Sequence, residues 1–138
     1  MSARFIVAVA FIIERDGAIL MLRRSPAKDF APGRWETGSG RVESGEHPEE
    51  AVHREVREET GLQVEIMGPV ATFHFYRGEA SEELIGITFW CRYRGGELVR
   101  SEEHDQAIWV SPEKAKSLVE SPGEVDAIDR VARGIARQ

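Results

Sequence analysis

The sequence predicts an α+β fold in which a mixed central sheet carries helices on both of its faces. Strand-like segments rich in β-branched and aromatic residues dominate the chain as far as residue 110. Helix start and stop signals bound three further segments, one in the middle of the chain and two near its C-terminal end. Because sheets and helices must each bury an apolar face, elements in this order favour helices packed on a sheet.

The first two elements form a predicted β-hairpin. Residues 4–13 and 18–24 have strand-like sequences, and the Asp16-Gly17 dipeptide between them is a strong hairpin signal. The first segment is apolar enough to suggest a signal peptide. It lacks a convincing small-residue cleavage site and runs straight into the turn, so a buried strand is the favoured interpretation.

The rest of the chain is divided by turn and cap residues. Residues 25–40 are predicted to be loop-rich, with a short strand near residues 35–37. Residues 48–60 are a predicted helix, because Pro48 takes the first helical position and Gly61 ends it. The other expected elements are strands at residues 63–76, 84–94 and 107–110 and helices at about 111–120 and 124–136. No linker or repeat divides residues 1–138, so we expect a single domain.

The composition argues against several classes of protein. No apolar run approaches the ~20 residues that cross a bilayer, so a membrane protein is not expected. The one cysteine, Cys91, cannot form an intrachain disulfide, which fits a reducing cytoplasm, and its apolar surroundings predict a packing role. The formal net charge of −6 disfavours non-specific binding to nucleic acid. An acidic protein that handles phosphates would need a metal ion to offset the repulsion.

Three carboxylates are predicted to converge on one face of the helix at residues 48–60. Glu55, Glu58 and Glu59 stand at positions i, i+3 and i+4. Such clustering costs roughly a few tenths of a kcal/mol per pair, and Mg²⁺ or Mn²⁺ would offset it because hard cations prefer carboxylate oxygens. The alternative is a solvated acidic face that Arg54 and Arg57 partly neutralise. The flanking glycines favour the metal site.

Residues 40–62, GRVESGEHPEEAVHREVREETGL, resemble the Nudix box. The defined positions of that pattern are matched by Gly40, Glu46, Arg54, Glu55, Val56, Glu58, Glu59, Gly61 and Leu62. The strand order and the segments around Trp35 and Trp109 are also similar to the family over most of the chain. The resemblance implies an α/β/α sandwich of the Nudix type. It also implies a hydrolase that cleaves the diphosphate linkage of a nucleoside diphosphate joined to another group.

The resemblance also implies a metal site and a residue that organises it. The implied metal ligands are the backbone carbonyl of Ser39 and the side chains of Glu46, Glu55, Glu58 and Glu59. Glu58 and Glu59 would be the principal ligands, and Glu46 would act through the metal shell or its waters. Arg54 would hold the carboxylates in place by forked hydrogen bonds. Mg²⁺ is the expected ion, with Mn²⁺ as the alternative.

The general base stays open between a glutamate of the box and an acid in a later loop. Within the box, Glu55 and Glu58 are the catalytic candidates. Outside it, the loop at residues 100–106 offers acids ahead of a strand, and Glu103 is favoured among them. His104, in the same loop, is more readily interpreted as a surface histidine than as a base.

Candidate substrate contacts lie outside the box. Arg23 and Arg24 end a strand where members of the family often contact the substrate, and Arg34 and Lys28 in the next loop are weaker candidates. Trp35 could stack on a base, although a half-buried packing role is as good an interpretation. Phe75 belongs to an aromatic strand end that would border the pocket.

One segment departs from the family pattern. Many members have Leu-Pro-Gly-Gly or Phe-Pro-Gly-Gly ahead of the box, whereas this chain has Thr37-Gly38-Ser39-Gly40. The missing proline is expected to loosen this loop. Ser39 also replaces a glycine whose backbone would approach the metal, although a serine can still offer its carbonyl.

The resemblance leaves the substrate open, with a nucleoside triphosphate or a small nucleotide sugar favoured. A second hypothesis is a nucleotide-binding or sensor module on the same scaffold, which would have lost acids of the box. A third is an acidic interaction domain, which the intact box disfavours. The expected partner is a small nucleotide rather than a nucleic acid or a membrane. The oligomeric state is open and includes a homodimer.

Overall fold

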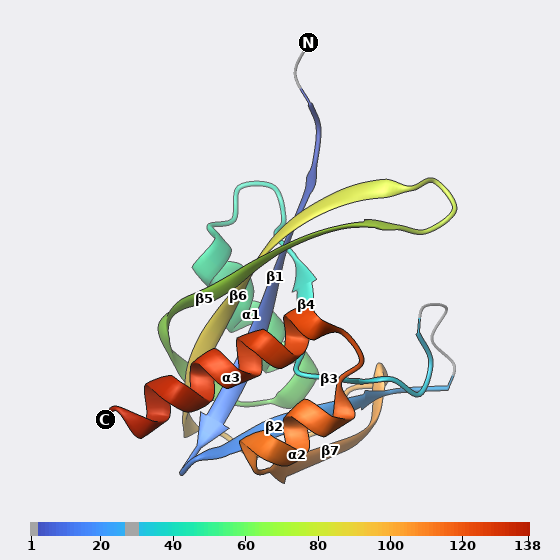
Figure 1. Ribbon diagram of the computed structural model, residues 1–138. Coiled ribbons are helices and arrows are strands. Elements are labelled where there is room, and N and C mark those ends of the chain that lie inside the picture. The colour runs from blue at the N-terminus through green and yellow to red at the C-terminus, as the bar shows by residue number, and fades with distance from the viewer. Residues whose placement is uncertain (1–2, 27–30) are drawn as a thin grey trace.

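The computed structural model describes residues 3–26 and 31–138 of the chain. The elements are β1 (Ile6–Arg15), β2 (Ala18–Arg24), β3 (Trp35–Glu36), β4 (Ser39–Arg41), α1 (Pro48–Thr60), β5 (Gln63–Arg77), β6 (Glu82–Gly95), β7 (His104–Val110), α2 (Pro112–Leu118) and α3 (Pro122–Ala136). In Figure 1, α2 and α3 lie in front of the sheet and α1 lies behind it. The prediction of a mixed sheet with helices on both faces is therefore confirmed.

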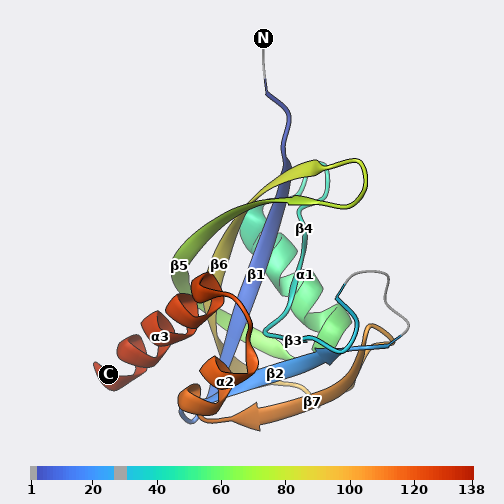
Figure 2. The same ribbon diagram turned by 45° about the vertical axis from the view of Figure 1, so that its right-hand side comes forward.

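The sheet is mixed because its central pair of strands is parallel. The strand order is β3-β2-β1-β6-β5, with β4 also pairing with β1 and β7 with β2. β1 runs parallel to β6, whereas the other pairs are antiparallel. Figure 2 shows β2 and β7 crossing the lower end of the long β1. The joined ends of β5 and β6 extend beyond the sheet near its upper end.

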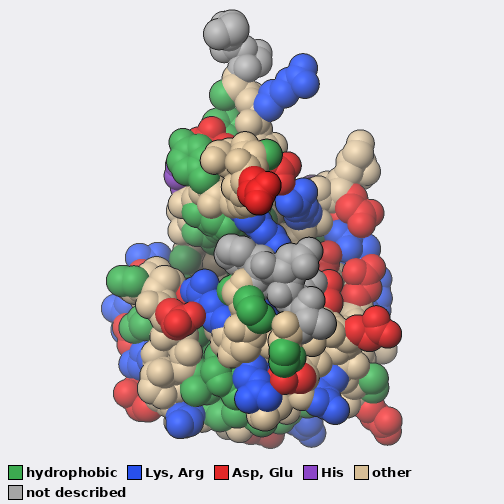
Figure 3. Space-filling model, turned by 90° about the vertical axis from the view of Figure 1, so that its right-hand side faces the viewer, with side chains coloured by type: hydrophobic (Ala, Val, Ile, Leu, Met, Phe, Trp, Pro, Cys, Tyr) green, Lys and Arg blue, Asp and Glu red, His purple; other side chains and the backbone are tan. Residues whose placement is uncertain are grey.

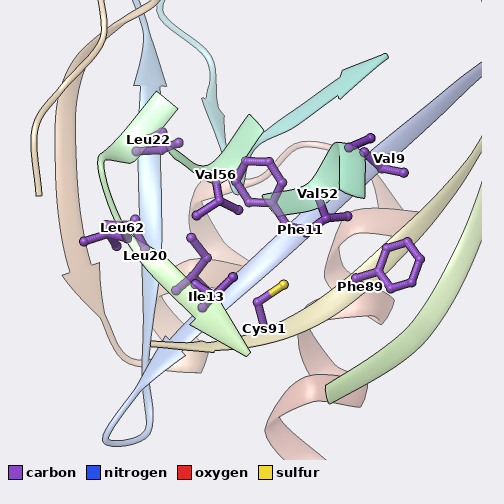
Figure 4. Close-up of a cluster of buried hydrophobic side chains, with 12 residues drawn as sticks. Val9, Phe11, Ile13, Leu20, Leu22, Val52, Val56, Leu62, Phe89 and Cys91 are labelled. Atoms are coloured by element: carbon purple, nitrogen blue, oxygen red, sulfur yellow. The ribbon is translucent and has the colours of Figure 1, made fainter. Parts of the chain in front are cut away.

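Alternation along β1 and β2 divides the interior into two cores. Val9, Phe11 and Ile13 face α1 and pack with Val52 and Val56 in one fully buried cluster (Figure 4). The next residues along the same strands point the other way. There, Ile12, Ile19 and Met21 pack against α2 and α3. The sheet thus has an apolar layer on each side, and these two layers fix the faces on which the helices sit.

The ends of α1 follow the predicted signals. His47 caps the first turn in a reciprocal capping box with Glu50, and Pro48 is the first helical residue. Gly61 ends the helix in the left-handed conformation at φ 76°, and its amide donates to the carbonyl of Arg57. A Cβ atom there would lie 2.7 Å from the carbonyl oxygen of Glu97. None of the helices in the described part of the chain is long and apolar enough to span a membrane.

Two loops are shorter than predicted. The loop-rich segment at residues 25–40 contains the expected short strand, β3, but its last two residues already belong to β4, which pairs with residues 8–10 of β1. The loop predicted at residues 100–106 is also shorter, because β7 begins at His104 and pairs with the end of β2. Both strands are set by partners far away in the sequence, so local composition gave no signal for them.

Candidate active site

Arg54 contacts acidic side chains both on α1 and in the segment before it. Its Nε and Nη2 atoms donate to Glu46 at 2.7 and 2.9 Å, and its Nη1 atom donates to Glu55 at 2.8 Å. The same Nη1 atom lies 3.3 Å from Glu58, and Nη2 donates to the carbonyl of Arg41 at 3.0 Å. The hydrogen bonds from Arg54 and from a backbone amide lower the pKa of Glu46 to about 2. The structure thus gathers these box residues around one guanidinium.

The three carboxylates of α1 differ in their surroundings. The side chain of Glu58 is 59% exposed, that of Glu55 is 15% exposed and that of Glu59 only 4%. Burial raises the pKa of Glu55. Burial, together with the charges of neighbouring acids, raises the pKa of Glu59 to about 10. In Figure 3, acidic side chains gather along the right-hand margin. This margin corresponds to the rear of the molecule in Figure 1, where α1 lies.

A second group of polar residues meets Glu59 from the sheet. His104 Nε2 lies 2.8 Å from Glu36 Oε2 and 3.8 Å from Glu59 Oε1. Glu36 also accepts from Arg24 Nη1 at 3.0 Å. Ligand atoms of Glu59, Glu103 and His104 all lie within 4.8 Å of one another. The interpretation of His104 as a surface histidine was wrong, because only 3% of the residue is exposed.

The glycine at the start of the box is required by Glu55. A Cβ atom on Gly40 would lie 2.1 Å from the Glu55 carboxyl carbon, so a larger residue would displace that side chain. The preceding Ser39 is exposed and pairs with Ala10 in β4. The amide of Phe11 donates to the carbonyl of Gly38 at 3.0 Å. Sheet hydrogen bonds therefore hold this segment in place, and a loosening by the missing proline stays a prediction.

A cavity of about 510 Å³ lies beside this group, between β5, the segment at residues 36–39 and the start of α3. The side chains that line it include Arg24, Arg34, Glu36, Ser39, Phe75 and Glu124. Arg34 forms an ion pair with Glu124 in the first turn of α3, and its Nε atom lies 3.2 Å from Glu120 Oε2. Because Glu36 lines the cavity and contacts His104, which lies 3.8 Å from Glu59, these two side chains connect the cavity to the buried carboxylate of α1.

The structure separates the four favoured candidates for substrate contacts into two pairs. Of the two weaker candidates, Arg34 also lines the cavity, and Lys28 lies outside the described residues. Arg24 and Phe75 line the cavity. Arg23 and Trp35 are absent from the described residues that line it. Arg23 instead forms a forked pair with Asp105, both bonds at 2.8 Å, and its guanidinium lies 5.9 Å from the centre of the Trp35 ring. Trp35 is half-buried and packs against the core on the α2 and α3 side. A role in substrate binding remains a prediction for each of the four.

Sequence reasoning missed Glu36 and undervalued His104. Glu36 stands between Trp35 and Thr37 in a segment with no motif, and its partners come from β2 and β7. The glutamate Glu103, in contrast, was favoured as a base, and the structure places it beside Glu59. Its catalytic role remains a prediction. A polar residue in a predicted short strand ahead of the acidic box was the one local signal for Glu36.

The donor set fits a hard divalent cation. The Oε2 atom of Glu59 is buried and has no hydrogen-bond partner among the residues that the structure describes. Buried carboxylate oxygens without a partner are rare, and a cation would satisfy one. A carboxylate oxygen of Glu103 lies within 4.8 Å of a carboxylate oxygen of Glu59, which suits the preference of Mg²⁺ for carboxylates.

Comparisons with known proteins give one family. A model described as the NUDIX domain matches residues 3–131. The chain is 33% identical over 126 residues to the CTP pyrophosphohydrolase of Escherichia coli strain K12, covering 91% of this chain and 90% of that protein. It is 34% identical over 112 residues to the nucleoside triphosphatase NudI of Escherichia coli O17:K52:H18, covering 74% of this chain and 79% of that protein.

Solved structures agree with this assignment. The MutT protein from Methanosarcina mazei Go1 aligns with a TM-score of 0.79 and 29% identity over 98% of both chains. The Escherichia coli ORF135 protein aligns with a TM-score of 0.76 and 31% identity, over 98% of this chain and 94% of that one. A Caenorhabditis elegans Ap4A hydrolase has a TM-score of 0.81 at 18% identity over 96% of this chain and 99% of that one, a likeness of fold alone.

Proposed function

Because the chain belongs to the Nudix hydrolase family, we propose that it is a Mg²⁺-dependent nucleoside triphosphate pyrophosphohydrolase. Its products would be a nucleoside monophosphate and inorganic diphosphate. One observation carries the proposal: Glu59, a buried carboxylate of the acidic helix, is connected to the cavity through His104 and Glu36. An ion held by this carboxylate would lie next to a ligand in the cavity.

The names of the relatives support a nucleoside triphosphate as the substrate. One is named a CTP pyrophosphohydrolase and another a nucleoside triphosphatase, and each is more than 30% identical to this chain. The cavity of about 510 Å³ falls within the usual range for small-molecule pockets, roughly 300–1,000 Å³. CTP is therefore the first substrate to test.

In the proposed reaction, a water oxygen bonds to phosphorus, and the phosphorus–oxygen bond to the leaving group breaks. Glu55, Glu58 and Glu59 would hold Mg²⁺, with the Ser39 carbonyl as a further ligand. When bound, the ion supplies positive charge that offsets the charge of the phosphates and favours ionisation of the attacking water.

The other steps belong to side chains of the chain itself. Arg54 holds Glu55 and Glu58 by hydrogen bonds, so that their carboxylates are oriented before the substrate arrives. Glu103 is exposed beside Glu59, and its carboxylate would accept the proton that leaves the water. Arg24, on the cavity wall, would orient the phosphate chain.

The test compares two glutamates of α1 in hydrolysis of the four common nucleoside triphosphates. Glu58→Gln keeps the size of an exposed side chain but removes a proposed ligand. Glu49→Gln makes the same change in the exposed first turn of the helix. We expect Mg²⁺-dependent release of diphosphate from wild type and Glu49→Gln, and its loss in Glu58→Gln. Products formed in ¹⁸O water identify the attacked phosphorus by mass.

Two outcomes would reject the proposal. One is wild-type protein that turns over none of the triphosphates with Mg²⁺ or Mn²⁺. The other is a Glu58→Gln variant as active as wild type, which would remove that residue from the metal site.

A further inference from the structure

Four polar side chains from four elements form a continuous line between the cavity and α1. Arg24, at the end of β2, donates to Glu36 of β3 at 3.0 Å. The same carboxylate oxygen lies 2.8 Å from Nε2 of His104, the first residue of β7. That nitrogen is 3.8 Å from the carboxylate of Glu59 on α1. The side chains of Arg24 and Glu36 are 12% and 16% exposed, and those of His104 and Glu59 are 0% and 4% exposed.

The chemistry of these contacts fixes the direction of the bond from His104. Glu36 already accepts a hydrogen bond from the guanidinium of Arg24, so its carboxylate is charged and can only accept. Nε2 of His104 must therefore carry the ring hydrogen and donate the hydrogen bond to Glu36. The imidazole cannot turn without breaking that bond. Its ring edge then limits where Oε1 of the buried Glu59 can lie, while Oε2 of that glutamate has no partner among the described side chains.

Stability alone does not account for this arrangement. Nδ1 of His104 and Oε2 of Glu59 are both buried without a hydrogen-bond partner in the described part of the structure. Partly satisfied buried polar groups destabilise a fold relative to apolar side chains of similar volume. A phenylalanine at position 104 would fill the space between β7 and α1 without that penalty. The polar groups therefore serve another purpose than packing.

We propose that Glu36 and His104 form a positioning pair that holds the carboxylate of Glu59 in its metal-binding orientation and ties that orientation to Arg24 on the cavity wall. The inference rests on the proposed function, because it assigns Glu59 to the metal site. His104 and Glu36 are positioning residues here: they act through Glu59 and need not touch the ion. Carboxylates and imidazoles behind metal ligands commonly have this effect, and their loss weakens metal affinity or activity by about 10–100-fold.

The test measures Mn²⁺ binding by electron paramagnetic resonance in nucleotide-free protein, together with Tm and the kinetics of triphosphate hydrolysis. His104→Phe keeps the ring volume and removes the donor, and His104→Gln restores an N–H near the position of Nε2. His53→Phe is the matched control, because His53 is a half-buried histidine of α1 outside the proposed site. We expect Mn²⁺ affinity to fall by about tenfold in His104→Phe and to stay close to wild type in the other two.

The kinetics separate positioning from a purely structural role. We expect kcat of His104→Phe to fall with the Mn²⁺ affinity while KM for the nucleotide stays unchanged, and His104→Gln to recover both. A His104→Phe protein with wild-type Mn²⁺ affinity and kcat overturns the proposal. Equal loss in His104→Phe and His104→Gln also overturns it, since that result indicates packing alone.

A second variant guards against a folding defect. If His104→Phe does not fold, Glu36→Gln decides, because it removes the charge of the acceptor and keeps its volume. Weakened Mn²⁺ binding in Glu36→Gln supports the positioning pair, and wild-type binding overturns it. Failure of the proposed function has a different signature: the wild-type protein binds Mn²⁺ but hydrolyses no triphosphate.

Discussion

Arg54 and Glu46 form a forked ion pair, with Nε donating to Oε2 at 2.7 Å and Nη2 to Oε1 at 2.9 Å. The pair joins the segment before α1 to the second turn of that helix. Because the third nitrogen of the guanidinium is left to face Glu55 and Glu58, one side chain sets the spacing of three acids. Such two-point contacts need the planar fork of arginine.

Replacement of this arginine by lysine should therefore weaken the metal site while keeping the charge. We expect Arg54→Lys to raise the Mg²⁺ concentration needed for half-maximal activity by at least about tenfold. An Mg²⁺ titration of initial rates measures the effect. Arg57→Lys is the control, since the Arg57 side chain is exposed on the same helix. Equal Mg²⁺ dependence in the two variants would contradict the role assigned to the fork.

The buried Glu59 predicts an unusual dependence of stability on pH in metal-free protein. Its pKa is raised from 4.5 to about 10, so the folded state holds the proton more tightly than the unfolded chain. Proton binding by Glu59 therefore stabilises the folded state fully below pH 4.5, and this stabilisation is lost as the pH rises towards 10. Glu59→Gln, which cannot ionise, should lack this loss.

Thermal unfolding in EDTA measures that effect. At pH 8 we expect the Tm of Glu59→Gln to exceed that of wild type by at least about 3 °C. Added Mg²⁺ should raise the Tm of wild type and leave the variant unchanged. A variant less stable than wild type in EDTA at pH 8 would show that ionisation of Glu59 is not unfavourable in the fold.

Gly40 should be needed for activity more than for stability. A Cβ atom at this position meets the end of the flexible Glu55 side chain, which can move away and lose its bond to Arg54. We expect Gly40→Ala to fold with a Tm close to wild type and to lose activity by about 100-fold, as small displacements of reacting groups do. Circular dichroism melts and rate measurements check the two parts.

The matched control is Gly95→Ala at the end of β6. A Cβ atom there makes an ordinary contact of 3.5 Å with Gln63 Oε1 and meets no other atom within 4 Å. This variant should keep both its Tm and its activity. Loss of activity in both variants would point to a general effect of adding a methyl group.

Cys91 should be unreactive in the folded protein. It is fully buried in the core on the α1 side, and burial raises the pKa of its thiol to about 12. Thiolate is the reactive form, so a disulfide reagent at pH 8 should label the protein only after denaturation. Labelling of native protein at the rate of a free thiol would contradict the packing role predicted for this residue.

The central helix shows how much of the site was present in the sequence. Pro48 and Gly61 mark its ends, and the spacing of Glu55, Glu58 and Glu59 places them within one turn. These features depend on neighbours within a few residues, which is why local pattern predicted them. The difference between the exposed Glu58 and the buried Glu59 was not predictable, because it depends on the strands that pack over the end of α1.

The sequence by itself determined the hairpin at Asp16-Gly17, the helix of the acidic box, the sheet with helices on both faces, and the family. Only the tertiary structure decided that Ser39 lies in a strand and that Arg24 rather than Arg23 lines the cavity. It alone joined Glu36 to His104 beside the acidic helix. The physical reason is that periodicity, caps and turns act over a few residues. Strand pairing and buried polar contacts join residues far apart in the chain, and their partners are chosen when the layers pack.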